Sequence, residues 1–370
     1  MNDAGHPAPA PVRLGDREVG PGRPVFVVAE LSANHGHDYD TARRLVEAAA
    51  RAGADAVKVQ TYTPDTLTIA CDRPEFRIGT GTQWEGRTLH DLYAEAHMPW
   101  DWQPRLMAAA AELGVPLFST PFDEKAVDFL EDMGVACHKI ASFELVDLPL
   151  IRKAAATGKP LIMSTGMASA DEVAEAVATA RAAGAGGLVL LKCTSAYPAT
   201  PDSMNLRTIG DLAARFGVPA GLSDHTLGIA VPVAAVALGA CMVEKHITLR
   251  RADGGPDAAF SLEPDEFGAM VQAVRVAEQA LGEVRYGVGV SEEASRVFRR
   301  SLFVVADVAA GEELTTENVR AIRPGYGLHT RHLDEVLGRR ASRDIARGTP
   351  LGWELVASGD PAAATIGSGT

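Results

Sequence analysis

Short apolar runs alternate with longer amphipathic segments along the chain up to Leu281. In the intervening segments, such as 39–52 and 170–183, apolar residues recur at the spacing of a helix face. Glycines such as Gly53 and Gly134 follow several of these segments, at the position where helices commonly end. The pattern therefore predicts strands and helices in alternation. The eight expected strands are Val25–Leu31, Asp55–Thr61, Val115–Thr120, Ala136–Ser142, Pro160–Thr165, Leu188–Thr194, Val218–Ser223 and Met242–Ile247.

Alternating strands and helices form a parallel sheet, because each helix returns the chain to the end where the previous strand began. Eight such repeats predict closure into a (β/α)8, or TIM, barrel of the α/β class. An open, doubly wound sheet is the alternative, and the lack of a glycine-rich fingerprint after the first strand counts against it. We therefore expect a barrel over residues 12–281.

Several regions depart from this repeat. Residues 62–104 form a long insertion between the second and third strands, and connections of that length usually have a function. After a linker at 282–298, residues 299–356 predict a small β-rich domain, with strand-like runs at 301–307 and 341–351 and a helical piece at 315–322. The two ends, 1–11 and 357–370, have the composition of disordered tails.

The composition is that of an ordinary globular protein, with 46% hydrophobic and 22% charged residues. Its net charge of −13 gives no reason to expect a nucleic acid or an acidic membrane as partner. No apolar run approaches the ~18 residues of a membrane span. The cysteines Cys71, Cys137, Cys193 and Cys241 lack the spacing of a metal site and indicate reduced thiols in a cytoplasmic protein.

Polar residues end or follow the expected strands almost without exception. Barrel enzymes place their active sites at the carboxyl ends of the strands, so these side chains should converge. A single Ser or Thr there is commonly a helix cap or a turn former, so the inference depends on the whole set. In chain order the set is Glu30, Asn34, His35, Lys58, Gln60, Thr61, Ser119, Thr120, Lys139, Ser142, Glu144, Ser164, Thr165, Lys192, Thr194, Ser195, Tyr197, Ser223, Asp224, His225, Glu244, Lys245 and His246.

Three lysines, Lys58, Lys139 and Lys192, interrupt apolar runs. A buried ammonium needs a partner, and three cations converging on one face suggest a bound polyanion. The nearby hydroxyls and helix N-termini suit the oxygens of a phosphate. The alternative is that these lysines form structural ion pairs with Glu30, Glu144 and Glu244.

His225 and His246 end the neighbouring seventh and eighth strands, where two imidazoles can reach one divalent ion. With Glu30 expected across the barrel, two histidines and oxygen ligands suit Mn²⁺ or a similar octahedral ion better than structural zinc. His138 precedes Lys139 and should face the opposite way, so it is not included.

These residues lie in motifs that resemble the sialic acid synthase family over about residues 24–356. The matching motifs are AELSANHG, KVQTYTPDT, FSTPFD, KIASFE, IMSTGMAS, CTSAYP, GLSDHT, EKHIT and GGPDAAFS. The C-terminal segment, with IRPGYG at 322–327, resembles the antifreeze-like (SAF) domain of these enzymes. Within the family, TYTPDTLT, LYAEAHMPW and SDHTLG are similar to the pseudaminic acid synthase branch. Met98 departs from the Thr expected before the PW pair, and Ser195 stands where the neuraminate branch usually has Asn.

The resemblance implies a condensation of phosphoenolpyruvate with an N-acetylated amino-sugar aldehyde, with a divalent metal (Mn²⁺, or Mg²⁺ or Co²⁺) as Lewis acid. It implies that His225 and His246 bind the metal and that Glu30 handles the proton or the water. The residues implied to hold phosphoenolpyruvate are Lys58, Thr120, Lys139, Ser142, Ser164, Ser195 and Ser223. Those implied to face the sugar are Gln60, Glu144, Tyr197 and Asp257, with Arg323 reaching the sugar site of the other subunit in a swapped homodimer.

Other functions remain open at this point. An N-acetylneuraminate or legionaminic acid synthase has the same chemistry with another amino sugar. A non-catalytic sugar-binding or coat protein could use the same barrel, although it has no need to keep the lysines, both histidines and Glu30 together. A condensing enzyme that takes a sugar phosphate is a third possibility, and the appended C-terminal domain counts against it.

Overall fold

The computed structural model describes residues 8–79, 81 and 84–358 of the chain. It divides into two compact units, Met1–Gly282 and Glu283–Thr370. The tails expected to be disordered lie largely outside the described residues, which include only 8–11 and 357–358 of them. None of the helices in the described part of the chain has both the length and the apolar character that crossing a bilayer requires.

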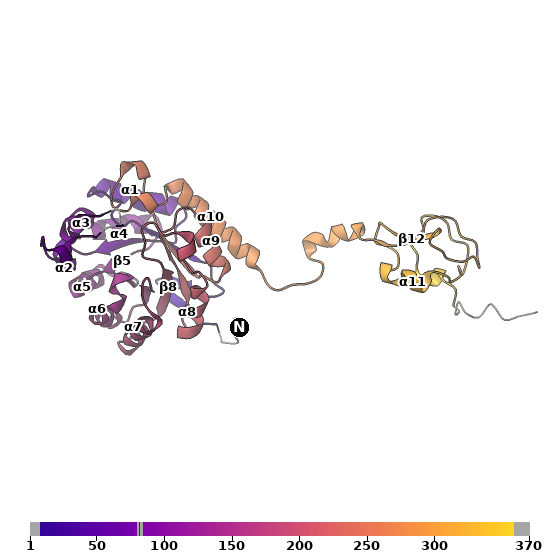
Figure 1. Ribbon diagram of the computed structural model, residues 1–370, viewed down its shortest axis with the longest axis horizontal. Helices are drawn as coiled ribbons and strands as arrows, with labels where there is room; N and C mark the ends of the chain where they lie inside the picture. The colour runs from indigo at the N-terminus through magenta and orange to yellow at the C-terminus, as the bar shows by residue number, and fades with distance from the viewer. Residues whose placement is uncertain (1–7, 80, 82–83, 359–370) are drawn as a thin grey trace, which may run out of the picture. The chain divides into compact units, whose positions relative to one another are not determined.

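The first unit is the expected eight-stranded barrel (Figure 1). All neighbouring strands are parallel, and the last pairs with the first, so the sheet closes on itself in the order β10-β3-β4-β5-β6-β7-β8-β9. Each strand lies within three residues of its expected bounds. The strands are β3 (Phe26–Glu30), β4 (Ala56–Thr61), β5 (Leu117–Pro121), β6 (His138–Ile140), β7 (Leu161–Ser164), β8 (Leu188–Cys193), β9 (Ala220–Asp224) and β10 (Met242–His246).

A helix follows each strand and packs outside the barrel, as Figure 1 shows. Polar residues begin several of these helices: the Asp38 side chain accepts hydrogen bonds at the start of α1, and Ser169 and Glu172 form a reciprocal cap on α7. The helices are α1 (Tyr39–Arg51), α4 (Trp102–Glu112), α5 (Glu124–Met133), α6 (Leu148–Ala155), α7 (Ala170–Ala182), α8 (Thr208–Phe216), α9 (Ala230–Ala237) and α10 (Pro264–Leu281). Short 3₁₀ turns lie in the connecting loops, at Phe143–Val146, Pro201–Ser203, Arg251–Asp253 and Ala258–Phe260.

An N-terminal hairpin that the sequence pattern did not predict packs on the apolar interior of the barrel. Its strands, β1 (Val12–Leu14) and β2 (Arg17–Val19), pair antiparallel. Their buried side chains form one cluster with interior residues near the start of the barrel strands, among them Phe26 and Met242. The amino end of the barrel is therefore filled with apolar side chains, which leaves the carboxyl end for a cavity.

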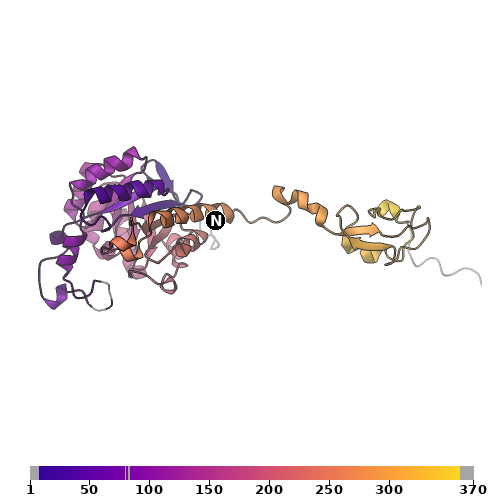
Figure 2. The same cartoon turned by 90° about the horizontal axis from the view of Figure 1, so that it is seen from above.

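The insertion at 62–104 forms α2 (Pro64–Leu67), a 3₁₀ turn (Pro74–Phe76) and α3 (Leu89–Ala96). Figure 2 shows it as the purple segment that stands out from one end of the barrel. A bridge between Arg77 and Thr88 closes its loop, and the Thr88 hydroxyl caps α3 by accepting from the Asp91 amide at 3.1 Å. The insertion therefore has secondary structure of its own.

The second unit has its own apolar core, built on the antiparallel strands β11 (Ser301–Val304) and β12 (Val319–Ile322). It also contains η6 (Val290–Phe298), η7 (Thr330–His332), α11 (Leu333–Val336) and η8 (Trp353–Leu355). Residues 290–298 of the expected linker thus form a 3₁₀ helix, and residues 341–351 form isolated bridges where a strand-like run was expected.

The prediction of a helix at 315–322 is wrong. Asn318 accepts from the Thr315 amide at 2.8 Å and donates to the Glu313 carbonyl at 2.9 Å, which makes a turn of the first half. The second half becomes β12 because Val319 enters the core and pairs with Val304. Tertiary packing here outweighs the local helical pattern.

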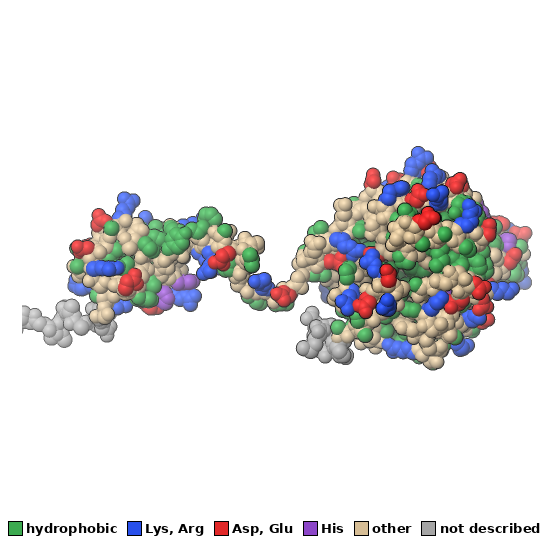
Figure 3. Space-filling view, turned by 180° about the vertical axis from the view of Figure 1, so that it is seen from behind, with side chains coloured by type: hydrophobic (Ala, Val, Ile, Leu, Met, Phe, Trp, Pro, Cys, Tyr) green, Lys and Arg blue, Asp and Glu red, His purple; other side chains and the backbone are tan. Residues whose placement is uncertain are grey.

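Acidic and basic side chains are interspersed on the face of the molecule that Figure 3 shows. Neither sign forms a continuous field there of the kind that a nucleic-acid site has.

Candidate active site

The interior of the barrel changes from apolar to polar toward the carboxyl ends of the strands. Side chains two residues apart on a strand share a face, so Val28 and Glu30 both point inward, as do Ala56 and Lys58. The polar layer lines a cavity of about 400 Å³, a size typical of small-molecule sites. Its polar strand residues are Glu30, Lys58, Gln60, Thr120, Lys139, Ser164, Ser223, Glu244 and His246.

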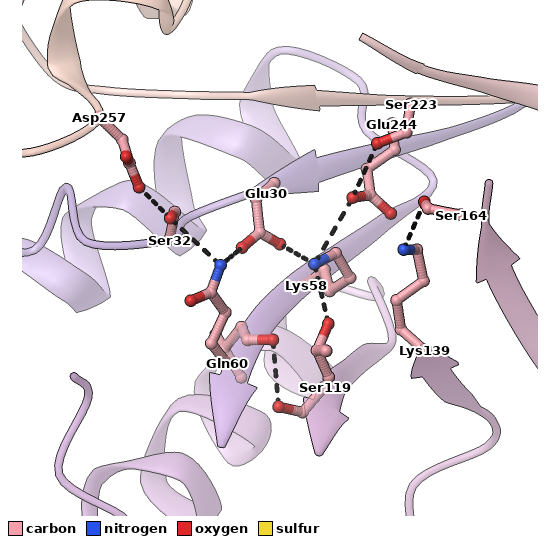
Figure 4. A network of polar contacts seen from close by, with 12 residues as sticks. Glu30, Ser32, Lys58, Gln60, Ser119, Lys139, Ser164, Ser223, Glu244 and Asp257 are labelled. Carbon is pink, nitrogen blue, oxygen red and sulfur yellow. Dashed lines mark hydrogen bonds and ion pairs between the residues drawn. The ribbon is translucent and has the colours of Figure 1, made fainter. Parts of the chain in front are cut away.

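Lys58 lies at the centre of a buried ion-pair network (Figure 4). Its Nζ lies 2.6 Å from Glu30 Oε2 and 3.5 Å from Glu244 Oε1, and it donates to Thr120 Oγ1 at 3.0 Å. Burial raises the pKa of Glu30, although Lys58 opposes the shift. Burial acts in the same direction on Glu244, but Lys139 and Lys58 outweigh it and lower its pKa. Lys58 thus forms ion pairs with two of the three glutamates considered in the sequence analysis, and its contact with a phosphate stays a prediction.

Lys139 has a different environment. Its Nζ donates to Ser164 Oγ at 2.6 Å and to the Ile140 carbonyl at 3.0 Å, and no ion pair among the described residues includes it. It is 2% exposed, and burial lowers the pKa of its ammonium. The charge of Glu244 opposes this shift but does not cancel it, so the buried ammonium is costly and the site favours an anionic ligand.

Lys192 does not join the other two lysines, so the expectation of three converging cations is wrong. It is absent from the cavity lining, and its Nζ donates to the Cys193 carbonyl at 2.5 Å and to Thr194 Oγ1 at 3.3 Å. The strand period explains the difference, because Cys193 is the residue of β8 that points inward. His138 faces outward as expected and contacts Glu131 Oε1 of α5 at 2.7 Å.

His225 and His246 face one another inside the cavity, with ring centroids 5.3 Å apart. His225 Nδ1 lies 3.0 Å from the Thr194 carbonyl, which can only accept, so this nitrogen carries a proton, and Nε2 has a lone pair when the ring is neutral. Burial lowers the pKa of His246 well below its ordinary value, so its imidazole is neutral, and its Nδ1 has no hydrogen-bond partner. Burial lowers the pKa of His225, but its contacts with Cys193 and the Thr194 carbonyl outweigh burial and raise that pKa. In their neutral forms the two imidazoles are suitable metal ligands.

The described residues contain no cluster of three or more His, Cys, Asp or Glu side chains arranged to hold a metal. Glu30 lies beside His246 rather than across the barrel, because β3 and β10 are neighbours and these two residues are register partners. A metal held by the two histidines would therefore take most of its ligands from water or substrate oxygens, as ions such as Mg²⁺ and Mn²⁺ commonly do.

A second polar chain runs from Glu30 toward the loop after β10 (Figure 4). Gln60 Nε2 donates to Glu30 Oε1 at 2.9 Å and to Ser32 Oγ at 3.2 Å, and Ser32 donates to Asp257. Burial raises the pKa of Asp257. Glu144 lines another side of the cavity, and burial raises its pKa to about 7.

Gly166 allows a close approach between the loops after β6, β7 and β8. A Cβ at this position would lie 2.3 Å from Ser195 Oγ and 2.7 Å from Ser142 Oγ, so no larger residue fits without a shift. Its amide donates to Ser142 Oγ at 3.1 Å. Ser142 lines the cavity, whereas Ser195 lies behind it, next to Gly166.

The cavity therefore brings together all the residues to which the family resemblance gave a role, except Ser195 and Arg323, the latter of which belongs to the second unit. Of the wider set of polar strand-end residues, the others that do not line it are Asn34, His35, Thr61, Ser119, Thr165, Lys192, Thr194, Asp224 and Lys245. The cavity also contains residues that the sequence analysis did not select. Ser32 lies beyond the end of β3 and has a backbone φ of 46°, so strand alternation does not indicate it. Cys193 was expected only to be a reduced thiol, but it lines the cavity, and its Sγ lies 3.9 Å from His225 Nδ1.

A closed parallel barrel with a polar cavity at the carboxyl ends of its strands defines the class of (β/α)8-barrel enzymes. The chain belongs to the NeuB family, whose model matches residues 45–286, and residues 299–357 match the SAF domain. The membership confirms the sialic acid synthase family expected from the motifs.

Individual proteins show the same relationship. A pseudaminic acid synthase of Campylobacter jejuni is 43% identical over 327 residues, which cover 88% of this chain and 95% of that protein. One from Helicobacter pylori is 42% identical over 89% of this chain and 97% of its own length. The crystal structure of an N-acetylneuraminic acid synthetase from Leptospira borgpetersenii superposes with a TM-score of 0.70 at 31% identity, covering 78% of this chain and 96% of that one.

Proposed function

We propose that this chain is a pseudaminic acid synthase, which condenses phosphoenolpyruvate with 2,4-diacetamido-2,4,6-trideoxy-L-altrose to give pseudaminic acid and phosphate. The similarity to pseudaminic acid synthases over 88–89% of the chain supports the choice of reaction. The observation that carries the proposal is Lys139, a buried ammonium that contacts no carboxylate directly and lies among the polar strand ends that form the floor of the cavity. Such a group fits a substrate with both a phosphate and a carboxylate.

Phosphoenolpyruvate would lie on this floor. Lys139 and Lys58 would neutralise its charge, and hydroxyl groups around them would donate to its oxygens. The hydroxyl residues are Thr120, Ser142, Ser164 and Ser223, all of which line the cavity. Ser195 would act behind them by fixing the loop against Gly166.

His225 and His246 would hold the divalent metal, with Mn²⁺ as the first candidate and Mg²⁺ or Co²⁺ as others. When bound, the metal would supply Lewis-acid polarisation of the sugar aldehyde. The tautomer needed for binding is fixed at His225 by the Thr194 carbonyl.

Carbon 3 of the enol then attacks the aldehyde carbon, which forms the new C–C bond. Water adds at carbon 2, and one of its protons ends on the former aldehyde oxygen, which becomes a hydroxyl group. The tetrahedral intermediate then forms the carbonyl at carbon 2 as the C–O bond to phosphate breaks, and the second water proton leaves with the phosphate. Glu30 is suited to hold or transfer a proton here, because burial raises its pKa while Gln60 fixes its Oε1 at 2.9 Å. Gln60, Glu144, Tyr197 and Asp257 surround the remaining volume, where the sugar would bind.

The proposed enzyme is a cytoplasmic homodimer, in which Arg323 of one copy completes the sugar site of the other. All four cysteines are free, which fits a reducing compartment. Mixing two inactive variants, Arg323→Ala and His225→Ala, should restore up to about a quarter to a half of the activity per site, since some mixed dimers contain one intact site. Zero activity in confirmed mixed dimers would contradict the exchange.

The reaction itself is tested by mass spectrometry of the products from phosphoenolpyruvate and a panel of N-acetylated amino sugars. The expected product is the nonulosonic acid of the 2,4-diacetamido-6-deoxy-L-altrose substrate, with one phosphate released for each molecule. A product formed only from N-acetylmannosamine would contradict the proposed sugar. The absence of any product across the panel would contradict the proposed reaction.

A further inference from the structure

The cavity has two unlike sides. The floor consists of the polar strand ends, whereas the insertion supplies a side that is largely apolar. We call the residues of the insertion that line the cavity the insertion wall. They are Leu67, Ile78, Trp84, Leu89, Leu92, Tyr93 and Ala96.

The insertion wall is held in place by contacts with the rest of the site. The Trp84 ring lies against Tyr197 with centroids 5.6 Å apart, and its indole N–H donates to the Pro256 carbonyl at 3.2 Å. Tyr93 packs against Tyr62, at the end of β4, with centroids 5.9 Å apart. These contacts connect the insertion to the loops after β8 and β10 and to β4, so the wall is part of the cavity.

The chemistry of the wall limits what can bind against it. Leu67, Ile78, Leu89 and Leu92 have no hydrogen-bonding group in their side chains. A hydroxyl group brought against them loses its bonds to water without replacement, which is costly. A methyl group placed there gains by leaving water.

We infer that the insertion wall receives the carbon-6 end of the sugar and selects a 6-deoxy sugar over its 6-hydroxy counterpart. This inference rests on the proposed function. The aldehyde carbon must reach the polar floor, where phosphoenolpyruvate would bind, so carbon 6, at the other end of the sugar, extends away from the floor. The acetamido groups bring methyl groups of their own, which also suit an apolar surface.

The test compares two substrates that differ only at carbon 6: the 2,4-diacetamido-6-deoxy sugar and its 6-hydroxy counterpart. The parent enzyme should prefer the deoxy sugar in kcat/KM by on the order of 100-fold, the discrimination that an apolar pocket gives against an added hydroxyl. Ile78→Thr should reduce this preference by about 3- to 10-fold, because one apolar wall residue becomes polar. The KM for phosphoenolpyruvate should not change, since Ile78 belongs to the wall and not to the floor.

Ile69→Thr is the matched control. Ile69 lies in the same insertion, is 58% exposed and does not line the cavity, so the preference should stay at the parent value. Leu89→Asn provides a second wall variant of similar side-chain shape, and it replaces Ile78→Thr if that protein does not fold.

Three results would overturn the inference, and they have different meanings. Equal use of both sugars by the parent would exclude selection at carbon 6 while leaving the proposed reaction intact. An unchanged preference in folded Ile78→Thr and Leu89→Asn would show that the insertion wall is not the selecting surface. No product from either sugar would overturn the proposed function together with this inference.

Discussion

Lys58 and Lys139 are both buried on the cavity floor, at 4% and 2% exposure, yet their partners differ. Lys58 contacts two carboxylates, whereas Lys139 contacts a hydroxyl and a carbonyl. The same substitution, lysine to methionine, should therefore change the free energy of unfolding in opposite directions. Methionine keeps most of the length of the side chain and removes the charge.

In Lys58→Met, Glu30 and Glu244 lose their shared cation in a buried site. Removing one partner of a buried ion pair typically costs ~3–5 kcal/mol. In Lys139→Met, the protein loses the hydrogen bonds to Ser164 and Ile140 and the attraction of Glu244, and it no longer buries an ammonium. The cost of that burial is the larger effect, because the net result is a lowered pKa of Lys139. We therefore expect Lys139→Met to be more stable than the parent.

The two effects are measured by urea denaturation of the substrate-free protein at neutral pH. Activity should change in the other sense for Lys139→Met, because a lost charged hydrogen bond of ~1.5–3 kcal/mol lowers kcat/KM for phosphoenolpyruvate by about 10- to 150-fold. Increased stability with decreased activity is the signature of a cation kept for a ligand. If Lys139→Met is destabilised as much as Lys58→Met, Lys139 is a structural cation and the argument for an anion site is wrong.

Three further outcomes are expected. Chelator treatment should abolish activity and Mn²⁺ should restore it, whereas full activity of metal-free protein would exclude the Lewis-acid role. Burial raises the pKa of Glu144 in the folded protein to about 7, because the charged form is disfavoured there. As the pH rises from 4.5 to above 7, the free energy of unfolding of the parent should therefore fall by ~3 kcal/mol relative to that of Glu144→Gln. Parallel pH profiles of the two proteins in urea denaturation would contradict this. Gly166→Ala should cost ~1–3 kcal/mol of stability in the same assay and weaken phosphoenolpyruvate binding, since its Cβ would collide with Ser142 and Ser195; parent-like values would contradict the close approach.

The barrel could be predicted because its signal is local and repeated. Each strand is an apolar run with polar residues at its carboxyl end, and each helix has a 3.6-residue pattern, so eight repeats support one another. The hairpin at residues 12–19 carries no such repeat, and it was not predicted. The hairpin packs Val12, Leu14 and Val19 against apolar side chains of the barrel interior, and such tertiary contacts leave no local pattern in the sequence.

The candidate site was predictable only as far as strand alternation was applied. A consistent period of two places Lys139 and Cys193 in the cavity and Lys192 outside it. The insertion wall could not be deduced in this way, because Ile78 and Leu89 reach the cavity through the packing of a long connection. The prediction of a helix at 315–322 failed for the same reason, because β12 forms only by pairing with β11.

The strand ends that carry His225 and His246 place polar side chains on both faces of the sheet. Asp224 and Lys245 are register partners on β9 and β10, and each directly adjoins one histidine. Both point away from the cavity, are fully buried and form an ion pair of 2.5 Å, while Thr226 also bonds to Asp224. Because a buried pair with these partners fixes the two strand ends relative to one another, it also fixes the relation between His225 and His246 on the opposite face. Strand alternation therefore gives the polar residues of SDHT and EKH two different roles. The histidines face the cavity, whereas Asp224 and Lys245 hold the two strand ends together behind it.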